Sequence, residues 1–289
     1  MPPDALSERM NHMITNTFVL DSRFPDCTLT TYIHSSSSEL AAPPRRAIIV
    51  CPGGAYYGLS DREAEPIALR FASEGFNAFV IRYSIKEKAV NDAPLIEGAL
   101  AVKHVREHAA EYSIDPDKIF VIGFSAGGHF AGMCGTLWND PVVRDALGID
   151  RGEAPEGINK PTATILSYPV ITGGPYAHRG SIDMLVGGPS EGTEGALRYS
   201  LELSVNADTC PAFIWHTYND PCVPVQNSLL YANAMAAAGV PFELHIYPDG
   251  PHGLSLCNEE TYAGYPGLIR PDVAGWIDEA VRYIKSFGA

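Results

Sequence analysis

The sequence predicts an α/β fold in which helices cover both faces of a mostly parallel sheet. From residue 47 onward, short apolar runs typical of buried strands alternate with longer stretches typical of helices. Strands that alternate with helices in this way form parallel sheets with right-handed crossovers. The 289 residues are 46% hydrophobic and 19% charged, a globular composition with enough chain for one large core. No break in composition divides the chain, so we expect a single domain over residues 1–289.

The first 46 residues are predicted to form leading strands and a loop. Residues 16–33 predict two short strands, because the stretch from Cys27 to Ile33 alternates and is rich in threonine. This pattern is typical of a half-exposed antiparallel strand. Residues 35–46 contain four serines and the Pro43-Pro44 pair, and they predict a loop.

The strands of the main sheet are predicted from continuous apolar runs, which indicate burial on both faces. They cover residues 47–51, 77–84, 118–122, 163–170, 211–217 and 242–247, with a turn at 115–117 before the third. Helices are predicted over residues 60–73, 93–112, 126–138, 225–238 and 271–287. We interpret Ser60-Asp61-Arg62-Glu63 as a capping box that opens the first helix. Residues 172–208 are predicted to be a small excursion between strands near the site, and the glycine-rich part 172–195 is interpreted as a loop or a small excursion.

Charge and hydropathy exclude several classes of function. The net charge of −14 repels phosphate backbones, so we expect no nucleic-acid partner. No run approaches 18 apolar residues, and the first ten residues lack a basic start followed by an apolar run. We therefore predict neither membrane insertion nor a signal peptide, and we expect a cytoplasmic protein. A homodimer is the assembly that we consider.

The cysteines predict free thiols rather than a disulfide framework. The six are widely spaced, and no C-x-x-C pair occurs. Cys51 and Cys134 lie in apolar segments, where a thiol behaves as a small hydrophobic group. A chain of this size does not depend on disulfides for stability.

One motif indicates a nucleophile. Residues 123–127, Gly-Phe-Ser-Ala-Gly, match G-x-S-x-G and lie between a predicted buried strand and a helix. Such a turn is tight enough to strain the serine backbone, and it lifts the hydroxyl above the carboxyl edge of the sheet. The N-terminus of the following helix favours negative charge at this point. We therefore predict that Ser125 is a nucleophile.

A base and an acid for Ser125 follow from the same reasoning. His252 lies on a loop framed by glycine and proline directly after the last predicted strand, from which it can reach the serine. Asp220 follows the strand at 211–217, and we prefer it to Asp249, which lies on the histidine's own loop. The resulting order of serine, aspartate and histidine along the chain is the one expected of this strand–turn–helix arrangement.

The donors for an oxyanion are predicted from two loops. The backbone N–H of Ala126 would point to the developing charge, and a second donor is expected from Gly54 or Ala55 after the first buried strand. Tyr56 and Tyr57 follow this loop, and either pocket-lining or structural roles remain open for them.

A metal site is not expected. His104-Val105-Arg106-Glu107-His108 fits the inverted zinc-protease pattern H-x-x-E-H, but no clear third ligand follows. We interpret the two histidines as solvated side chains that flank the buried face of a helix. His129 is expected to pack or to form hydrogen bonds, and the three tryptophans are expected in the core.

These segments together resemble α/β-hydrolases of the esterase–lipase type, in particular bacterial acetylxylan and feruloyl esterase-like proteins. The resemblance extends roughly over residues 45–255, and its matching pieces are Cys51-Pro-Gly-Gly-Ala-Tyr-Tyr, Ser60-Asp-Arg-Glu-Ala-Glu, Gly-Phe-Ser125-Ala-Gly-Gly-His, Asp220-x-x-Val-Pro and Pro-His252-Gly. It implies an eight-stranded sheet, ester hydrolysis without a cofactor, and acetyl groups on plant polysaccharide sugars as substrates. One difference is the oxyanion loop, where many relatives have His-Gly-Gly-Gly and this chain has Pro52-Gly53-Gly54-Ala55.

The sequence thus predicts a serine carboxylic-ester hydrolase that deacetylates sugars or xylan-derived oligosaccharides through Ser125, His252 and Asp220. The absence of a long apolar lid favours short acyl groups. If the negative field persists at the pocket, it favours neutral esters over anionic ones. Two alternatives are a serine peptidase of the prolyl-oligopeptidase type and a non-catalytic binding protein on the same fold.

Overall fold

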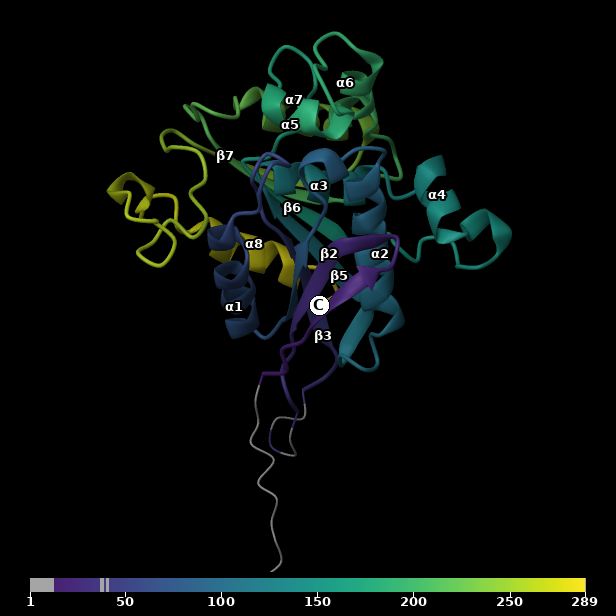
Figure 1. Ribbon diagram of the computed structural model, residues 1–289. Helices are drawn as coiled ribbons and strands as arrows, with labels where there is room; N and C mark the ends of the chain where they lie inside the picture. The colour runs from purple at the N-terminus through teal and green to yellow at the C-terminus, as the bar shows by residue number, and fades with distance from the viewer. Residues whose placement is uncertain (1–12, 37–38, 40–41, 289) are drawn as a thin grey trace, which may run out of the picture.

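The computed structural model describes residues 13–36, 39 and 42–288, and its centre is an eight-stranded sheet with the order β1-β2-β4-β3-β5-β6-β7-β8 (Figure 1). β2 pairs antiparallel with both β1 and β4, and every other pair is parallel. The strands are β1 (Thr17–Asp21), β2 (Phe24–Tyr32), β3 (Arg45–Cys51), β4 (Asn77–Arg82), β5 (Ile114–Phe124), β6 (Ala163–Ser167), β7 (Ala212–Thr217) and β8 (Phe242–Tyr247). The predicted fold class and both leading strands are confirmed.

Helices cover both faces of the sheet, and the two faces bury separate clusters. In β3, Ile48 and Val50 pack into the cluster that includes α1 and α8, whereas Ile49 and Cys51 pack into the one that includes α2 and α3. This alternation follows from the two-residue period of a strand that is buried on both sides. The helices are α1 (Glu65–Ser73), α2 (Ala93–Glu107), α3 (Ala126–Thr136), α4 (Pro141–Leu147), α7 (Gln226–Ala238) and α8 (Trp276–Lys285).

The predicted excursion lies beyond the carboxyl ends of the parallel strands, at the top of Figure 1. It contains α5 (Arg179–Val186) and α6 (Glu194–Arg198), so the glycine-rich segment 172–195 is not wholly a loop. Short 3₁₀ turns occur at Asp61–Glu63, Lys86–Lys88, Ile149–Arg151, Leu201–Leu203 and Pro266–Leu268. The start of the chain (residues 1–12) and residues 37, 38, 40 and 41 of the predicted loop lie outside the described residues.

Several predicted boundaries of helices and strands differ from those in the structure. The predicted helix over residues 93–112 ends at Glu107, and the last predicted helix begins at Trp276 rather than at residue 271. The predicted turn at 115–117 interrupts the pairing of β5 with β3, although Ile114 belongs to the same strand. α4 was missed, although Asp140 accepts a hydrogen bond from the Val142 N–H and Pro141 follows it, which is a typical helix start.

The capping-box interpretation was also wrong. The Ser60 side chain makes no capping hydrogen bond, and the first turn is a 3₁₀ turn before α1. The Glu63 carboxylate instead accepts a hydrogen bond from the backbone N–H of Gly53, which lies in a different loop. A buried acceptor for a loop N–H has thus replaced the local pairing that the pattern suggested.

The described residues contain no helix long and apolar enough to cross a bilayer. All six cysteines are free thiols, and five of them are buried while Cys222 is exposed.

One buried carboxyl group couples this fold to pH. Glu97 on α2 is fully buried and accepts hydrogen bonds from the backbone N–H and the hydroxyl of Ser84. Burial outweighs these hydrogen bonds and raises the pKa of Glu97 to about 7. Between about pH 4.5 and pH 7, the folded chain therefore holds a proton that the unfolded chain releases. The free energy of unfolding falls as the pH rises through this range.

Glu97→Gln is expected to remove this pH dependence, because a glutamine offers Ser84 similar partners and does not ionise. We expect the wild type to lose about 2–3 kcal/mol of stability between pH 5 and pH 8 relative to the variant. Urea denaturation of both proteins at the two pH values measures this difference. Parallel pH profiles of the two proteins would contradict this account of Glu97.

Candidate active site

The turn between β5 and α3 holds Ser125 in a strained conformation above the sheet. Its backbone has φ 55° and ψ −118°, which side-chain-bearing residues rarely adopt. The turn requires glycine at two flanking positions. A Cβ at Gly123 would lie 1.8 Å from the carbonyl oxygen of Gly127, and a Cβ at Gly127 would lie 2.1 Å from that of Cys51. The sequence G-x-S-x-G thus folds as a strand–turn–helix elbow, as predicted.

The structure brings Ser125, His252 and Asp220 together in one chain of hydrogen bonds. His252 Nε2 lies 2.8 Å from Ser125 Oγ, and His252 Nδ1 lies 2.7 Å from Asp220 Oδ2. Because a carboxylate only accepts, Nδ1 carries the hydrogen, and Nε2 is left to accept the Ser125 hydroxyl proton. This is the arrangement of a nucleophile, a base and an orienting acid.

Asp220 is held as a carboxylate by its surroundings. Its Oδ1 accepts hydrogen bonds from the N–H groups of Cys222 and Val223, at 2.8 and 2.9 Å. Burial opposes ionisation, but the nearby His216 ring, whose Nε2 lies 3.5 Å from Asp220 Oδ2, and the hydrogen bond from His252 outweigh it and hold the pKa of Asp220 below its usual range. Asp249, the alternative acid, instead pairs with Arg270 at the surface.

The predicted oxyanion donors have no protein partners in the described part of the chain. Ala126 is the first residue of α3, and Gly54 and Ala55 lie in the turn after β3, where Ala55 has φ 59°. No hydrogen bond from their N–H groups occurs among the described residues, whereas Tyr57 and Gly58 both donate to the Gly54 carbonyl and close the turn. Free N–H groups beside a nucleophile are what an oxyanion requires.

Sequence reasoning missed a carboxylate that supports the oxyanion loop. Glu63 is buried, and it accepts hydrogen bonds from the Gly53 N–H at 2.9 Å and from the Tyr168 hydroxyl at 2.6 Å. The Tyr168 hydroxyl in turn accepts from the Ser255 N–H, and its ring packs edge-on against His252 with ring centroids 5.0 Å apart. Glu63 therefore links the oxyanion loop to the support of the histidine.

Glu63→Gln is expected to lower kcat roughly tenfold to a hundredfold, because an amide cannot accept from both the Gly53 N–H and the Tyr168 hydroxyl. The cost should be smaller than that of deleting an oxyanion donor, since the donors themselves remain. Steady-state hydrolysis of p-nitrophenyl acetate measures the effect, with Glu65→Gln as a matched control at the exposed start of α1. An unchanged kcat in a folded Glu63→Gln protein would contradict the positioning role.

A pocket of about 280 Å³ opens over these groups. It is formed by the oxyanion loop, the 3₁₀ turn after it, the elbow, the histidine loop and the start of the excursion. The lining residues are Gly54, Ala55, Ser60, Arg62, Glu63, Ser125, His178, Cys222, His252 and Gly253. The predicted excursion thus contributes His178 to the pocket that contains Ser125.

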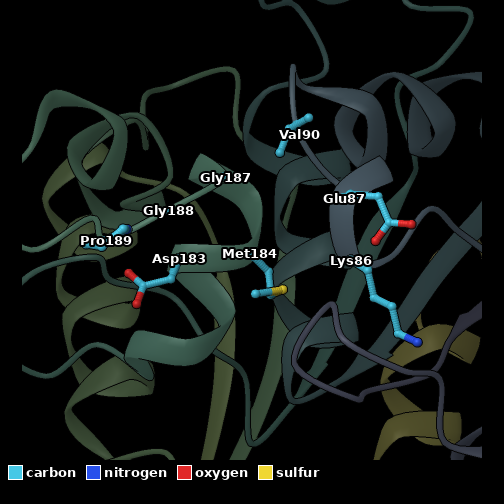
Figure 2. Close-up of a pocket in the computed structure, with 8 residues that line it drawn as sticks. All are labelled: Lys86, Glu87, Val90, Asp183, Met184, Gly187, Gly188 and Pro189. Carbon is cyan, nitrogen blue, oxygen red and sulfur yellow. The ribbon is translucent and has the colours of Figure 1, made fainter.

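A larger pocket of about 420 Å³ lies elsewhere, between the segment from Lys86 to Val90 and helix α5 (Figure 2). Met184 extends from α5 toward the segment that carries Lys86 and Glu87. This pocket is not lined by Ser125, His252 or Asp220. The reacting groups therefore lie in the smaller pocket.

Residues 35–235 match the BD-FAE family. The chain belongs to this family.

The chain is 37% identical over 243 residues to endo-1,4-beta-xylanase B of Butyrivibrio fibrisolvens. The aligned region covers 83% of this chain and 36% of that protein. The chain is 29% identical to the acetylxylan esterase of Xylanibacter ruminicola, over 81% of this chain and 46% of the relative. The chain therefore spans between about a third and a half of the length of these curated relatives.

Solved structures extend the comparison over nearly the whole chain. The acetyl ester-xyloside bifunctional hydrolase of Caldicellulosiruptor lactoaceticus is 35% identical, with a TM-score of 0.75 over 91% of this chain and 88% of that one. The carboxylesterase Cest-2923 of Lactobacillus plantarum is 27% identical, with a TM-score of 0.80 over 96% and 98%. The BD-FAE chain thus has the α/β-hydrolase fold that the sequence predicts, and its resemblance to esterases of this fold is confirmed.

The two tyrosines after the oxyanion loop do not line the pocket of the BD-FAE chain. Tyr56 is fully buried and its hydroxyl lies 2.9 Å from His129 Nδ1, so of the two roles that the sequence left open the structural one holds and the pocket-lining one does not. Tyr57 is 64% exposed, and Lys86 Nζ lies 5.0 Å from the centre of its ring. His129 forms hydrogen bonds with the Tyr56 hydroxyl and the Tyr199 carbonyl, as expected. Burial lowers the pKa of the His129 ring to about 4.

The histidines of the H-x-x-E-H pattern pack against each other. The rings of His104 and His108 stack with centroids 4.0 Å apart, and Glu107 pairs with Lys103 instead of facing them. Burial lowers the pKa of His104 to about 4, so its ring is less solvated than predicted. The described residues contain no group of three or more His, Cys, Asp or Glu that could hold a metal ion.

Proposed function

We propose that this chain is a serine carboxylic-ester hydrolase that removes acetyl groups from sugars or xylan-derived oligosaccharides. The observation that carries the proposal is the hydrogen-bond chain from Ser125 through His252 to Asp220 at a strained elbow. This chain lies beside backbone N–H groups that have no partner among the described residues.

Each group has a role in the proposed mechanism. His252 Nε2 accepts the proton as Ser125 Oγ attacks the ester carbonyl, and Asp220 stabilises the imidazolium that forms. The oxyanion accepts hydrogen bonds from Ala126 and from the Gly54–Ala55 segment. His252 then protonates the leaving alcohol. In the second half of the reaction His252 accepts a proton from water, which attacks the acyl-enzyme, and returns that proton to Ser125 Oγ as the acid leaves.

A short acyl group fits the pocket. The pocket that contains Ser125 has a volume of about 280 Å³, just below the range of roughly 300–1,000 Å³ that is typical of sites for drug-sized ligands. The names of two relatives, an acetylxylan esterase and an acetyl ester-xyloside hydrolase, support acetylated sugars as the substrate class.

A panel of esters and peptides tests the proposal against its alternatives. We expect acetate release from acetylated xylo-oligosaccharides, with kcat/KM falling as the acyl chain of a matched p-nitrophenyl ester lengthens. Cleavage of proline-containing peptides without ester hydrolysis would instead indicate a peptidase. Turnover of neither class, with saturable binding of the oligosaccharide, would indicate a binding protein.

A further inference from the structure

Arg62 brings a positive charge to the pocket that contains Ser125. It is half-buried in the 3₁₀ turn after the oxyanion loop and lines this pocket. Its Nη1 donates hydrogen bonds to the carbonyl oxygens of Gly253 and Thr261, both at 2.9 Å. These two contacts fix the guanidinium in place, since one nitrogen is held by two acceptors on a different loop.

The charge of Arg62 is not balanced by an ion pair in the described part of the chain. Some arginines of this chain pair with carboxylates, as Arg70 does with Glu74, whereas others, such as Arg45, donate among the described residues only to carbonyl oxygens, as Arg62 does. The partners of Arg62 are two neutral carbonyls, and both bond the same nitrogen. What sets Arg62 apart is its place: it is half-buried and lines the pocket that contains Ser125, where a ligand carboxylate could form charge-assisted hydrogen bonds with its remaining N–H groups.

The remaining donors lie beside the residue that follows the base. A Cβ built on Gly253 would lie 3.3 Å from Arg62 Nη2, so this nitrogen adjoins the His252–Gly253 segment. In the proposed mechanism His252 protonates the leaving alcohol, so a group that adjoins the His252–Gly253 segment is within reach of the alcohol part of the substrate. The Ser60 hydroxyl lines the same pocket and makes no hydrogen bond within the described residues, so it offers a second donor.

The adjacent Glu63 lines the same pocket, but within the described residues it forms no ion pair with Arg62. Both of its carboxylate oxygens are occupied, one by the Gly53 N–H and the other by the Tyr168 hydroxyl. The guanidinium presents paired N–H groups that match the two oxygens of a carboxylate.

We propose that the Arg62 guanidinium binds a carboxylate on the alcohol part of the substrate, so that the preferred esters are acetyl esters of acidic sugars such as hexuronic acids. This inference rests on the proposed esterase function. It also revises the expectation from net charge, because a local guanidinium outweighs a diffuse field that salt screens.

The test compares two substrates that differ by one methyl group, which removes the negative charge: an acetylated methyl glucosiduronic acid and its methyl ester. Acetate release by the wild type, Arg62→Gln and Arg62→Lys gives kcat/KM for each substrate. We expect the ratio of acid to methyl ester to fall about tenfold or more in Arg62→Gln and by less in Arg62→Lys. Added salt should lower the ratio in the wild type more than in Arg62→Gln.

Arg45→Gln is the matched control, since Arg45 donates to the Gly75 carbonyl and does not line the pocket. Its ratio should equal that of the wild type. An equal loss on both substrates in Arg62→Gln would overturn the inference, because it would show that Arg62 only holds the Gly253 and Thr261 loops. If Arg62→Gln releases acetate from both substrates with the same ratio of acid to methyl ester as the wild type, the inference is overturned as well. Acetate release from neither substrate by the wild type would overturn the proposed function itself.

Discussion

Replacing Ser125 with alanine is expected to lower kcat for p-nitrophenyl acetate by about 10³-fold or more. The reason is that Ser125 Oγ is the atom that His252 Nε2 contacts at 2.8 Å, and the described pocket offers no other hydroxyl in contact with that nitrogen. Oxyanion donors and binding groups remain, so some catalysis over water should persist.

The control for this variant is Ser73→Ala, which removes an exposed hydroxyl at the end of α1 and should leave kcat unchanged. Thermal unfolding of the Ser125→Ala protein establishes that the fold is intact. Turnover of the folded Ser125→Ala protein within a fewfold of the wild type would contradict Ser125 as the nucleophile.

Asp220→Asn is expected to lower kcat by about 10³- to 10⁴-fold through the histidine tautomer. To keep the hydrogen bonds from Cys222 and Val223, the asparagine carbonyl must take the place of Oδ1. Its NH₂ group then faces His252 Nδ1 and favours the tautomer with the hydrogen on Nε2. That nitrogen can no longer accept the proton of Ser125.

Asp249→Asn makes the same chemical change on the aspartate that pairs with Arg270 at the surface. Its kcat should stay within about twofold of the wild type, since Asp249 contacts neither His252 nor Ser125 in the structure. A large loss in Asp249→Asn together with a small one in Asp220→Asn would reverse the assignment of the acid.

The parts of the fold that the sequence predicts are those determined locally. The apolar run of β3 and the tight turn around Ser125 each depend on residues a few positions apart. Their side-chain types leave little choice of conformation. The meeting of Asp220 and His252, which follow β7 and β8, with Ser125 agrees with the rule that loops at the carboxyl ends of parallel strands meet.

Contacts between distant loops could not be predicted in this way. Glu63 has the spacing of a capping box, yet its partners are Gly53 and Tyr168, of which the second is 105 residues away. Tyr56 follows the oxyanion loop, but its positive φ and its contact with His129 turn it into the core. Arg62 reaches the pocket because it bonds to loops that lie 191 and 199 residues further along the chain.

Mass spectrometry after treatment with a fluorophosphonate tests the central claim most directly, because such reagents label a serine only when a base activates it. We predict a single adduct on the peptide that contains Ser125, formed in parallel with the loss of esterase activity. The adduct should be absent in a folded Asp220→Asn protein over the same interval. Loss of activity with the adduct on another residue, or full activity after complete labelling of Ser125, would contradict the account.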